Sequence, residues 1–409
     1  MIKIPSTLLN DIIIIGQQPW DTEIGSNCKN IALELSKTNR VLYINSPLDR
    51  ITFYRGKDDP KVQKRINVIR HREEGLIKIQ DNLWNYYPDC IVESINFLNS
   101  TGIFSFINKF NNKRLAKSIS KVIESLRFKN IILFNDNEMF KGFYLQEFLK
   151  PTLSIYYSRD YMLGVDYWKK HGQVLEPLLI GKSDLCFTNS EYLADYCRKY
   201  NEISYNVGQG CEIESFKNVS NDMIGELAGL NKPLIGYVGA LNSQRLDIAI
   251  IEHIAVSYPE YTIVLVGPED ETFLASVLHR LNNVVFVGQR AVTDLPGFIN
   301  AFDICINPQL VNEITIGNYP RKIDEYLALG KPVIATRTKT MEAFNTYVYL
   351  AENKEEYVQF VAQAIAEDSE LKSSARKAFA ETHTWENSVQ EMKNRIAAVL
   401  ETAEGGIKK

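Results

Sequence analysis

The segment Asn318-Tyr319-Pro320-Arg321-Lys322-Ile323-Asp324-Glu325-Tyr326-Leu327-Ala328-Leu329-Gly330-Lys331-Pro332-Val333-Ile334-Ala335-Thr336 decides the fold class of this chain. Its pattern is typical of a short helix that leads into a buried strand. Proline is favoured in the first turn of a helix, which suits Pro320, and glycine is favoured just past the end, which suits Gly330. The β-rich run 333–336 then predicts the strand.

Two charged side chains share one face of this predicted helix. Lys322 and Glu325 are three residues apart near the helix N-terminus, where free backbone N–H groups favour anions. This pair suits a nucleoside diphosphate, with the ammonium for the phosphates and the carboxylate for the ribose hydroxyls. The alternative is a solvated ion pair on an ordinary amphipathic helix, worth about 0.2–0.5 kcal/mol.

The same segment resembles the donor-site motif of the GT-B glycosyltransferases of group 1 (GT4-like), in a bacterial polysaccharide-biosynthesis subgroup. That motif reads roughly Pro-x-Lys-x-x-Glu-Tyr-Leu-Ala-x-Gly-Lys-Pro-Val. The resemblance implies the GT-B fold, an α/β architecture of two doubly wound Rossmann-like domains that face each other across a cleft. It also implies a C-terminal helix that crosses back to the N-terminal domain.

Strand-like and helix-like patterns alternate along the chain, as in parallel sheets built from βαβ units. We expect strands near 12–15, 41–45, 131–134, 153–157, 185–188 and 204–207, then near 234–238, 263–266, 284–287, 304–307 and 333–336. The glycines and proline of 221–233 suggest a linker. The predicted parts are an N-terminal acceptor domain (1–220), the linker (221–233), a C-terminal nucleotide-sugar domain (234–385), and the crossover helix with its tail (386–409).

The composition is that of a globular protein. The chain has 409 residues, of which 45% are hydrophobic and 23% charged, so two domains are expected. Its formal net charge of -4 argues against a general nucleic-acid binder. The six cysteines lack a Cys-x-x-Cys pair, and no apolar run approaches the length of a membrane span. We therefore expect reduced thiols and a cytoplasmic location.

Two glycines end neighbouring predicted strands of the C-terminal domain. Gly239 and Gly267 allow backbone N–H groups to approach a phosphate, and Arg245 in the loop after Gly239 offers a forked cation. The resemblance implies that the donor pyrophosphate binds at these turns. A glycine that only completes a turn is the alternative.

The loop 312–318 precedes the motif helix, and its Glu313 and Thr315 are candidates for contact with the donor sugar. Many retaining GT-B enzymes carry two glutamates separated by seven residues. Counting back from Glu325, the first of that pair is replaced here by Gly317. The resemblance therefore leaves retention and inversion both open.

The acceptor side is expected after the first predicted strand, at Gly16, Trp20 and Asp21. The Trp20 ring offers a stacking surface to a sugar, and Asp21 a carboxylate to its hydroxyls. The alternative is a plain loop with one half-buried tryptophan.

Asp160 is the candidate base, because it resembles in position an acidic residue that related inverting GT-B enzymes hold near the acceptor. For inversion a carboxylate must take the proton from the attacking hydroxyl. The alternative for Asp160 is an ion pair with Arg159 or a helix N-cap.

Residues 101–130 hold seven basic residues against one glutamate, a local charge of +6, together with an aromatic cluster and apolar residues at helical spacing. Such a segment can rest on the anionic inner face of the cytoplasmic membrane. The alternative is a helix with a buried apolar face and a solvated basic face.

No two histidines have metal-ligand spacing, and GT-B folds generally need no metal because cationic groups neutralise the leaving diphosphate. We thus expect no cofactor or metal, with a nucleoside diphosphate sugar as co-substrate. The sugar would pass to a hydroxyl of a glycan or lipid-linked glycan in bacterial surface polysaccharide biosynthesis. The alternatives are a non-hydrolysing sugar-nucleotide epimerase and a non-catalytic scaffold that binds a nucleotide sugar.

Overall fold

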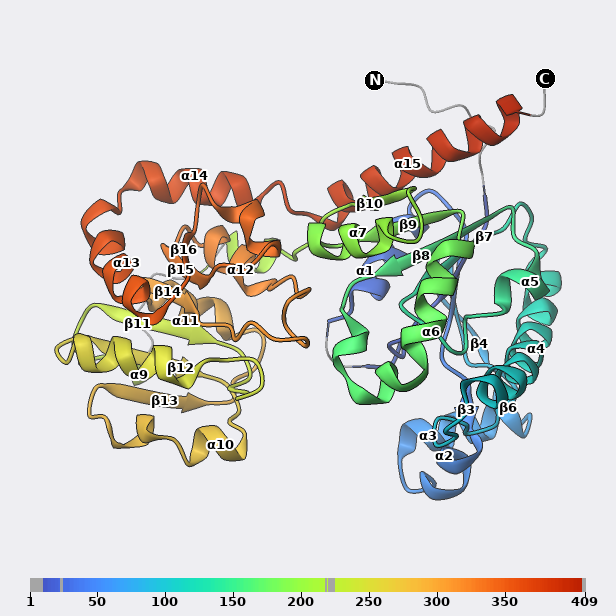
Figure 1. The fold of residues 1–409 in the computed structure, drawn as a ribbon, viewed down its shortest axis with the longest axis horizontal. Coiled ribbons are helices and arrows are strands. Elements are labelled where there is room, and N and C mark those ends of the chain that lie inside the picture. The colour runs from blue at the N-terminus through green and yellow to red at the C-terminus, as the bar shows by residue number, and fades with distance from the viewer. Residues whose placement is uncertain (1–9, 23–24, 218, 220–224, 407–409) are drawn as a thin grey trace. The chain divides into compact units, whose positions relative to one another are not determined.

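The computed structural model describes residues 10–22, 25–217, 219 and 225–406. The chain divides into two compact units, with the boundaries between Gly208 and Gln209 and between Asn387 and Ser388. Unit 1 comprises the first part of the chain and its C-terminal segment, and unit 2 is the part between (Figure 1).

The core of unit 1 is an eight-stranded sheet in the order β10-β9-β8-β7-β1-β2-β5-β4. Its strands are β1 (Ile12–Ile15), β2 (Val41–Ile44), β4 (Leu76–Gln80), β5 (Leu83–Tyr86), β7 (Ile132–Asp136), β8 (Leu153–Ser158), β9 (Leu185–Thr188) and β10 (Ser204–Asn206). All neighbours pair in parallel except β4 and β5, which are antiparallel. A separate parallel pair joins β3 (Leu48–Asp49) to β6 (Ile91–Val92).

Helices cover the sheet of unit 1 because its strands are apolar on both faces. They are α1 (Asn27–Ser36), α4 (Thr101–Leu126), α5 (Leu145–Leu149), α6 (Asp166–Lys182) and α7 (Glu191–Arg198), while α2 (Arg50–Arg55) contacts β3, β6 and α3 (Pro60–Ile69). The buried face of α4 packs on the sheet, with Leu115 and Ile119 in one cluster with Ile13 and Leu133.

The final helix, α15 (Trp385–Gly406), contacts unit 1, as the resemblance implied. The Arg395 guanidinium lies 4.3 Å from the ring centroid of Tyr205 in β10, and Ser388 Oγ donates to Gly208 O at 3.5 Å. The end of the predicted tail, residues 407–409, lies outside the described residues.

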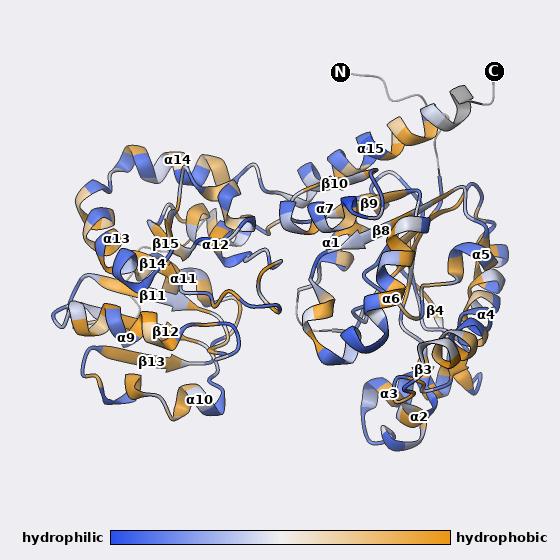
Figure 2. Ribbon diagram, in the orientation of Figure 1, coloured by the Kyte–Doolittle hydropathy of each residue, from blue (hydrophilic) through white to orange (hydrophobic). Residues whose placement is uncertain are grey.

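Unit 2 has a six-stranded parallel sheet in the order β13-β12-β11-β14-β15-β16. The strands are β11 (Leu234–Val238), β12 (Thr262–Val266), β13 (Val284–Gly288), β14 (Ile304–Asn307), β15 (Val333–Thr336) and β16 (Tyr349–Ala351). Figure 2 shows β11, β12 and β13 as hydrophobic strands, as expected for a sheet covered on both faces.

Two layers of helices enclose this sheet. The helices are α8 (Glu214–Lys217), α9 (Ile248–Ser257), α10 (Glu271–Leu274), α11 (Leu295–Ala301), α12 (Lys322–Ala328), α13 (Lys354–Glu367) and α14 (Glu370–Ala380). One core cluster includes residues of α9 and α13, and the other includes residues of α11, α12 and α14. Both units are therefore doubly wound α/β domains.

The strand order places a topological switch point in each unit, where ligands of doubly wound sheets bind. In unit 2, β11 lies between β12 and β14, so the loop that begins at Gly239 leaves the sheet at that point. In unit 1, β1 lies between β2 and β7, and Gly16 begins the corresponding loop.

Unit 2 begins earlier in the chain than the predicted linker. The Cys211 backbone N–H donates to His383 O at 2.9 Å, and Ile213 and Phe216 join the core of unit 2. Within 221–233, residues 221–224 lie outside the described residues, and the buried Leu227 packs in the same core.

All six cysteines are free thiols. In the described parts of the chain, no helix combines the length and the apolar character that crossing a bilayer requires.

Candidate functional site

Gly239 and Gly267 lie in direct contact at the switch point of unit 2. Their φ angles are +141° and +151°, which L side chains rarely adopt. A Cβ on Gly267 would lie 2.0 Å from Gly239 O, so the loops after β11 and β12 can approach this closely only with glycine. The structure therefore brings together two glycines that are predicted at the phosphate-binding turns.

The Lys322 ammonium reaches the same point from the first residue of α12. A Cβ on Gly239 would lie 2.8 Å from Lys322 Nζ. The ammonium donates a hydrogen bond to Tyr237 Oη and lies 3.9 Å from the centroid of that ring. No carboxylate of the described residues forms an ion pair with Lys322, so its charge is available to an anionic ligand.

Tyr326 holds α12 against the end of β11, a role that the sequence analysis missed. Its hydroxyl accepts a hydrogen bond from the Val238 backbone N–H at 2.9 Å, one residue before Gly239. Tyr326 is fully buried. The sequence shows a tyrosine one residue after the motif glutamate. Only the folded structure shows that its hydroxyl binds the end of β11.

The carboxylate of Glu325 lies one turn from Lys322 and is half-buried. Burial raises its pKa, Asp324 and Glu212 add to that effect, and Arg321 and Lys322 oppose it. No side chain of the described residues donates a hydrogen bond to this carboxylate, as the hydrogen bonds around α12 show. A hydroxyl donor such as a ribose would satisfy it.

The helix itself differs slightly from the prediction. It begins at Lys322, two residues after Pro320, whose carbonyl accepts from the Ile323 N–H at 2.9 Å. Gly330 lies past the end at φ +73°, which confirms its predicted role. The buried carboxylate of Asp324 anchors the helix, because His383 Nδ1 lies at 2.6 Å and Tyr319 Oη donates at 2.9 Å.

The loop that carries Arg245 is tied to the loop 310–315. Arg245 O accepts from the Leu310 N–H at 2.9 Å, and Gln244 O accepts from Asn312 Nδ2 at 2.9 Å. The side chains of Arg245 and Glu313 are both exposed. The two predicted donor residues thus lie on adjoining loops of unit 2.

Thr315 differs from the expectation of contact with the sugar. It is 1% exposed, and its hydroxyl donates to Leu310 O inside its own loop. The hydroxyl therefore shapes the loop instead of presenting itself to a ligand.

On the acceptor side, the structure explains Gly16 by packing. A Cβ there would lie 2.2 Å from the Tyr43 ring, which Trp20 contacts edge-on at 5.1 Å between centroids. The Lys29 ammonium lies 5.5 Å from the Trp20 ring centroid, and Trp20 N donates to Asn45 Oδ1 at 2.8 Å. Trp20 is half-buried, as the alternative interpretation expects, and its contact with a sugar stays a prediction.

Asp21 forms an ion pair with Arg65, and its predicted contact with sugar hydroxyls stays a prediction. The two guanidinium nitrogens of Arg65 donate to its two oxygens at 2.8 and 3.0 Å. Burial acts to raise the pKa of Asp21, but the hydrogen bonds and charge of Arg65 outweigh it and lower the pKa. Each oxygen accepts one hydrogen bond from Arg65, which fixes the carboxylate in the loop after β1.

Asp160 makes the ion pair that the sequence left open as its alternative. Arg159 Nη1 donates to Asp160 Oδ2 at 2.8 Å, while Arg159 Nε donates to the fully buried Asp136 at 2.9 Å. Arg159 also donates to Gln17 Oε1 at 2.9 Å. The Asp160 side chain remains 40% exposed at the carboxyl end of β8. Asp136 was not predicted as a site residue, although an aspartate that ends an apolar strand was a signal.

The described residues contain no group of three histidine, cysteine or acidic side chains that could hold a metal ion.

Residues 232–367 match the family model of the glycosyl transferases group 1. Over 196 residues the chain is 29% identical to TuaH of Bacillus subtilis (strain 168), a glycosyltransferase assigned to teichuronic acid biosynthesis. That alignment covers 45% of this chain and 48% of TuaH, so the chain spans about half the length of this relative.

Solved structures share the fold over nearly the whole chain. HepE of Anabaena, in complex with UDP, has a TM-score of 0.65 at 16% identity, with 95% of this chain and 100% of HepE covered. Sucrose-phosphate synthase of Thermosynechococcus elongatus has a TM-score of 0.68 at 12% identity, with 96% and 100% covered. The chain has the GT-B fold. The residues that match the family model of the glycosyl transferases group 1 make up most of unit 2.

Proposed function

We propose that this protein transfers a sugar from a nucleoside diphosphate sugar to a hydroxyl of a glycan or lipid-linked glycan in the synthesis of bacterial surface polysaccharide. The observation that carries the proposal is the Lys322 ammonium against Gly239, at the switch point of unit 2 and inside the family match. HepE is seen with UDP and with UDP-glucose, and TuaH is assigned to teichuronic acid biosynthesis.

The roles of the donor residues follow from their chemistry. As the sugar leaves, negative charge grows on the β-phosphate, and the Lys322 ammonium stabilises it, with Arg245 as a second cation. Gly239 and Gly267 let the diphosphate approach the backbone, and Glu325 accepts from the ribose hydroxyls. With these cations in place, the leaving diphosphate needs no metal ion.

For an inverting transfer, we assign the base to Asp160. Its carboxylate is partly exposed at the carboxyl end of β8, and Arg159 fixes its orientation. A carboxylate at this place can accept the proton from the attacking hydroxyl.

The experiment that tests this function is incubation of the protein with UDP-, GDP- and ADP-sugars, with and without a lipid extract that supplies acceptor. We expect acceptor-dependent transfer from one donor and only slow hydrolysis without acceptor. Formation of an epimeric nucleotide sugar would instead establish the epimerase, and binding without turnover the scaffold. In the same assay, transfer by Asp160→Asn at the wild-type rate across the pH range would exclude Asp160 as the base.

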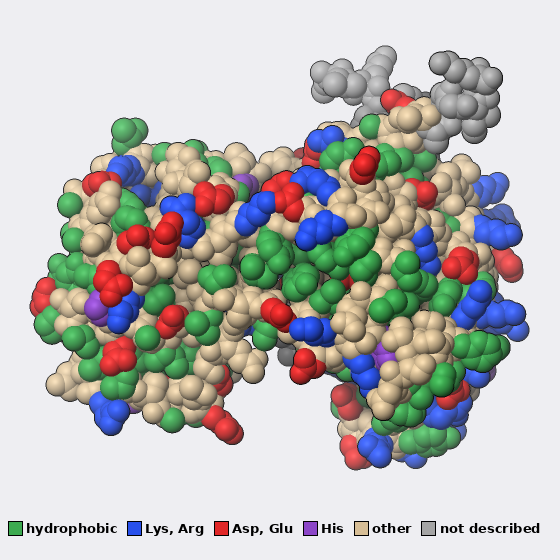
Figure 3. All heavy atoms as spheres, viewed as in Figure 1, with side chains coloured by type: hydrophobic (Ala, Val, Ile, Leu, Met, Phe, Trp, Pro, Cys, Tyr) green, Lys and Arg blue, Asp and Glu red, His purple; other side chains and the backbone are tan. Residues whose placement is uncertain are grey.

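A surface stripe on α4 supports the membrane part of the proposal. Exposed residues follow each other at helical spacing, first apolar and then basic, and we call them the α4 stripe: Ile103, Phe106, Phe110, Lys113, Lys117 and Lys121. In Figure 3 hydrophobic and basic side chains adjoin on the side of unit 1 that carries α4. Apolar side chains can enter the interface while Lys113 and Lys117 meet anionic headgroups, whereas Lys121 already pairs with Asp89 at 2.8 Å.

Replacing Lys113 and Lys117 together by glutamine should weaken binding to anionic vesicles by about tenfold or more, since each basic residue near such a surface contributes about 1 kcal/mol. Co-sedimentation with vesicles of phosphatidylglycerol and phosphatidylcholine measures it. The Lys57→Gln/Lys199→Gln protein, which also loses two exposed lysines of unit 1, is the control. Equal loss in both variants would refute a specific role for the stripe.

A further inference from the structure

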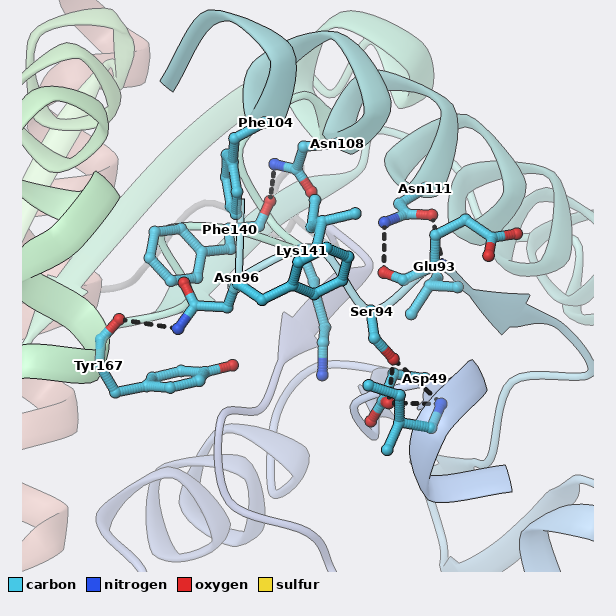
Figure 4. A pocket seen from close by; sticks show the side chains of 14 residues that line it. Asp49, Glu93, Ser94, Asn96, Phe104, Asn108, Asn111, Phe140, Lys141 and Tyr167 are labelled. Carbon is cyan, nitrogen blue, oxygen red and sulfur yellow. Dashed lines mark hydrogen bonds between the residues drawn. The ribbon is translucent and has the colours of Figure 1, made fainter. Parts of the chain in front are cut away.

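A cavity of about 310 Å³ lies in unit 1, and none of the residues discussed so far as donor or acceptor contacts lines it (Figure 4). Segments that follow three parallel strands help to line it: Asp49 follows β2, Lys141 follows β7, and Tyr167 follows β8. The cavity therefore lies on the carboxyl-end side of the sheet, where doubly wound domains bind their ligands.

The walls of this cavity are mainly apolar. Phe104 of α4 packs edge-on against Phe140, with 5.1 Å between ring centroids, and both rings are buried. Ile51, Phe97 and Tyr167 line it too, and are 45%, 69% and 54% exposed. Exposed apolar side chains beside an apolar cavity indicate a site for an apolar ligand or partner.

Three charged side chains line the cavity, and two of them are already paired. Asp49 accepts from the backbone N–H groups of Ile51 and Thr52 at 3.0 and 3.1 Å, and from the Ser94 hydroxyl. Glu93 accepts from Arg50 and Arg114, whose hydrogen bonds lower its pKa to about 2.

Lys141 is the third of these charges and has no such pairing. Its ammonium donates to the neutral hydroxyl of Ser46, and it forms no ion pair within the described residues. Figure 4 shows this ammonium in the open space among Tyr167, Asn96 and Asp49. The Tyr167 hydroxyl points into the same space and has no hydrogen bond to a described residue. The charge of Lys141 helps to lower the pKa of Asp49, but no carboxylate of the described residues forms an ion pair with this ammonium, so an anionic group on a ligand can pair with it.

We propose that this cavity binds the phosphate end of a lipid-linked acceptor, with the first part of the chain against the apolar walls and the phosphate on Lys141. The α4 stripe begins beside it, because Ile103 of the stripe precedes the wall residue Phe104. A lipid held by the stripe thus has a short path to the cavity. The inference rests on the proposed transfer to a lipid-linked glycan and names the chemistry that recognises the acceptor.

Calorimetric titration with farnesyl phosphate, farnesol and inorganic phosphate tests the proposal without any sugar transfer. We expect farnesyl phosphate to bind at least about tenfold more tightly than either of the others, because only it offers both the chain and the charge. Lys141→Met should weaken the binding of farnesyl phosphate at least about tenfold. Lys199→Met is the control and should leave this binding unchanged, because Lys199 is an exposed residue at the C-terminal end of α7.

A second variant keeps the test independent of folding. Phe97→Asp places a carboxylate on a highly exposed side chain that lines the cavity, so the fold should persist while farnesyl phosphate binding falls. Equal affinity for farnesyl phosphate and farnesol, or unchanged binding by both variants, would overturn the proposal. Lys322→Ala, which removes the donor cation, should bind farnesyl phosphate normally. Sugar transfer by a wild-type protein that binds no farnesyl phosphate would refute this inference and leave the proposed function standing.

Discussion

Replacing Lys322 by alanine should lower the rate of sugar transfer by about two orders of magnitude or more, the scale for losing one preorganised group that stabilises charge in a transition state. The ammonium is held in place before any ligand arrives, by the Tyr237 hydroxyl and by contact with the face of its ring. Its position beside Gly239 suits the departing diphosphate. Initial rates at saturating donor and acceptor measure the effect.

A matched control is Lys354→Ala, because Lys354 is also the first residue of a helix in unit 2 and is exposed. That variant should transfer at the wild-type rate. Tyr237→Phe keeps the ring but removes the hydroxyl that accepts from Lys322, so its rate should fall by less than that of Lys322→Ala. Near-normal transfer by a folded Lys322→Ala protein would contradict the assignment of the site.

Glu176→Gln should stabilise the protein at pH 8 and leave it nearly unchanged at pH 5. Glu176 is 1% exposed in α6, and burial raises its pKa to about 7, although hydrogen bonds from Tyr156 and Tyr196 at 2.7 and 3.1 Å act to lower it. The ordinary value is 4.5. Between these two values the folded protein holds one more proton than the unfolded chain, so the free energy of unfolding falls as pH rises.

The raised pKa of Glu176 corresponds to about 3 kcal/mol of folding stability. This stability is fully present below the unfolded pKa of 4.5 and is lost by pH 8. Glutamine imitates the protonated acid and escapes this loss. Melting temperatures of both proteins from pH 5 to pH 8 measure the difference, with Glu191→Gln on the surface of α7 as the control. A difference between wild type and Glu176→Gln that stays constant over this range would exclude the titration of Glu176.

The sequence predicted the central strands well because their apolar runs are buried on both faces and end in turn residues. It missed β4 and β5, although Leu76–Gln80 alternates and Asn82, at φ +63°, makes the turn. The reason is that β4 lies at the edge of the sheet and is partly exposed, so its pattern is weaker than that of a buried strand. The short edge strand β16 was missed as well.

The site was predictable where the residues lie close in sequence or obey backbone rules. Lys322 and Glu325 share a helix turn, and the positive φ angles of Gly239 and Gly267 require glycine. The partners of Asp21 were not predictable, since Arg65 lies 44 residues away. Nor was the cavity around Lys141, because its lining comes from segments that only the folded sheet assembles.

The most direct test of the account is whether the phosphates, and not the nucleoside, are bound through Lys322. A thermal-shift screen with UDP, GDP, ADP and CMP first selects the nucleotide, since a ligand of the folded form raises Tm. Calorimetric titration of that diphosphate and of its nucleoside then compares wild type with Lys322→Ala. We expect Lys322→Ala to weaken diphosphate binding at least about tenfold and to leave nucleoside binding unchanged. Equal diphosphate affinity in the two proteins would contradict it.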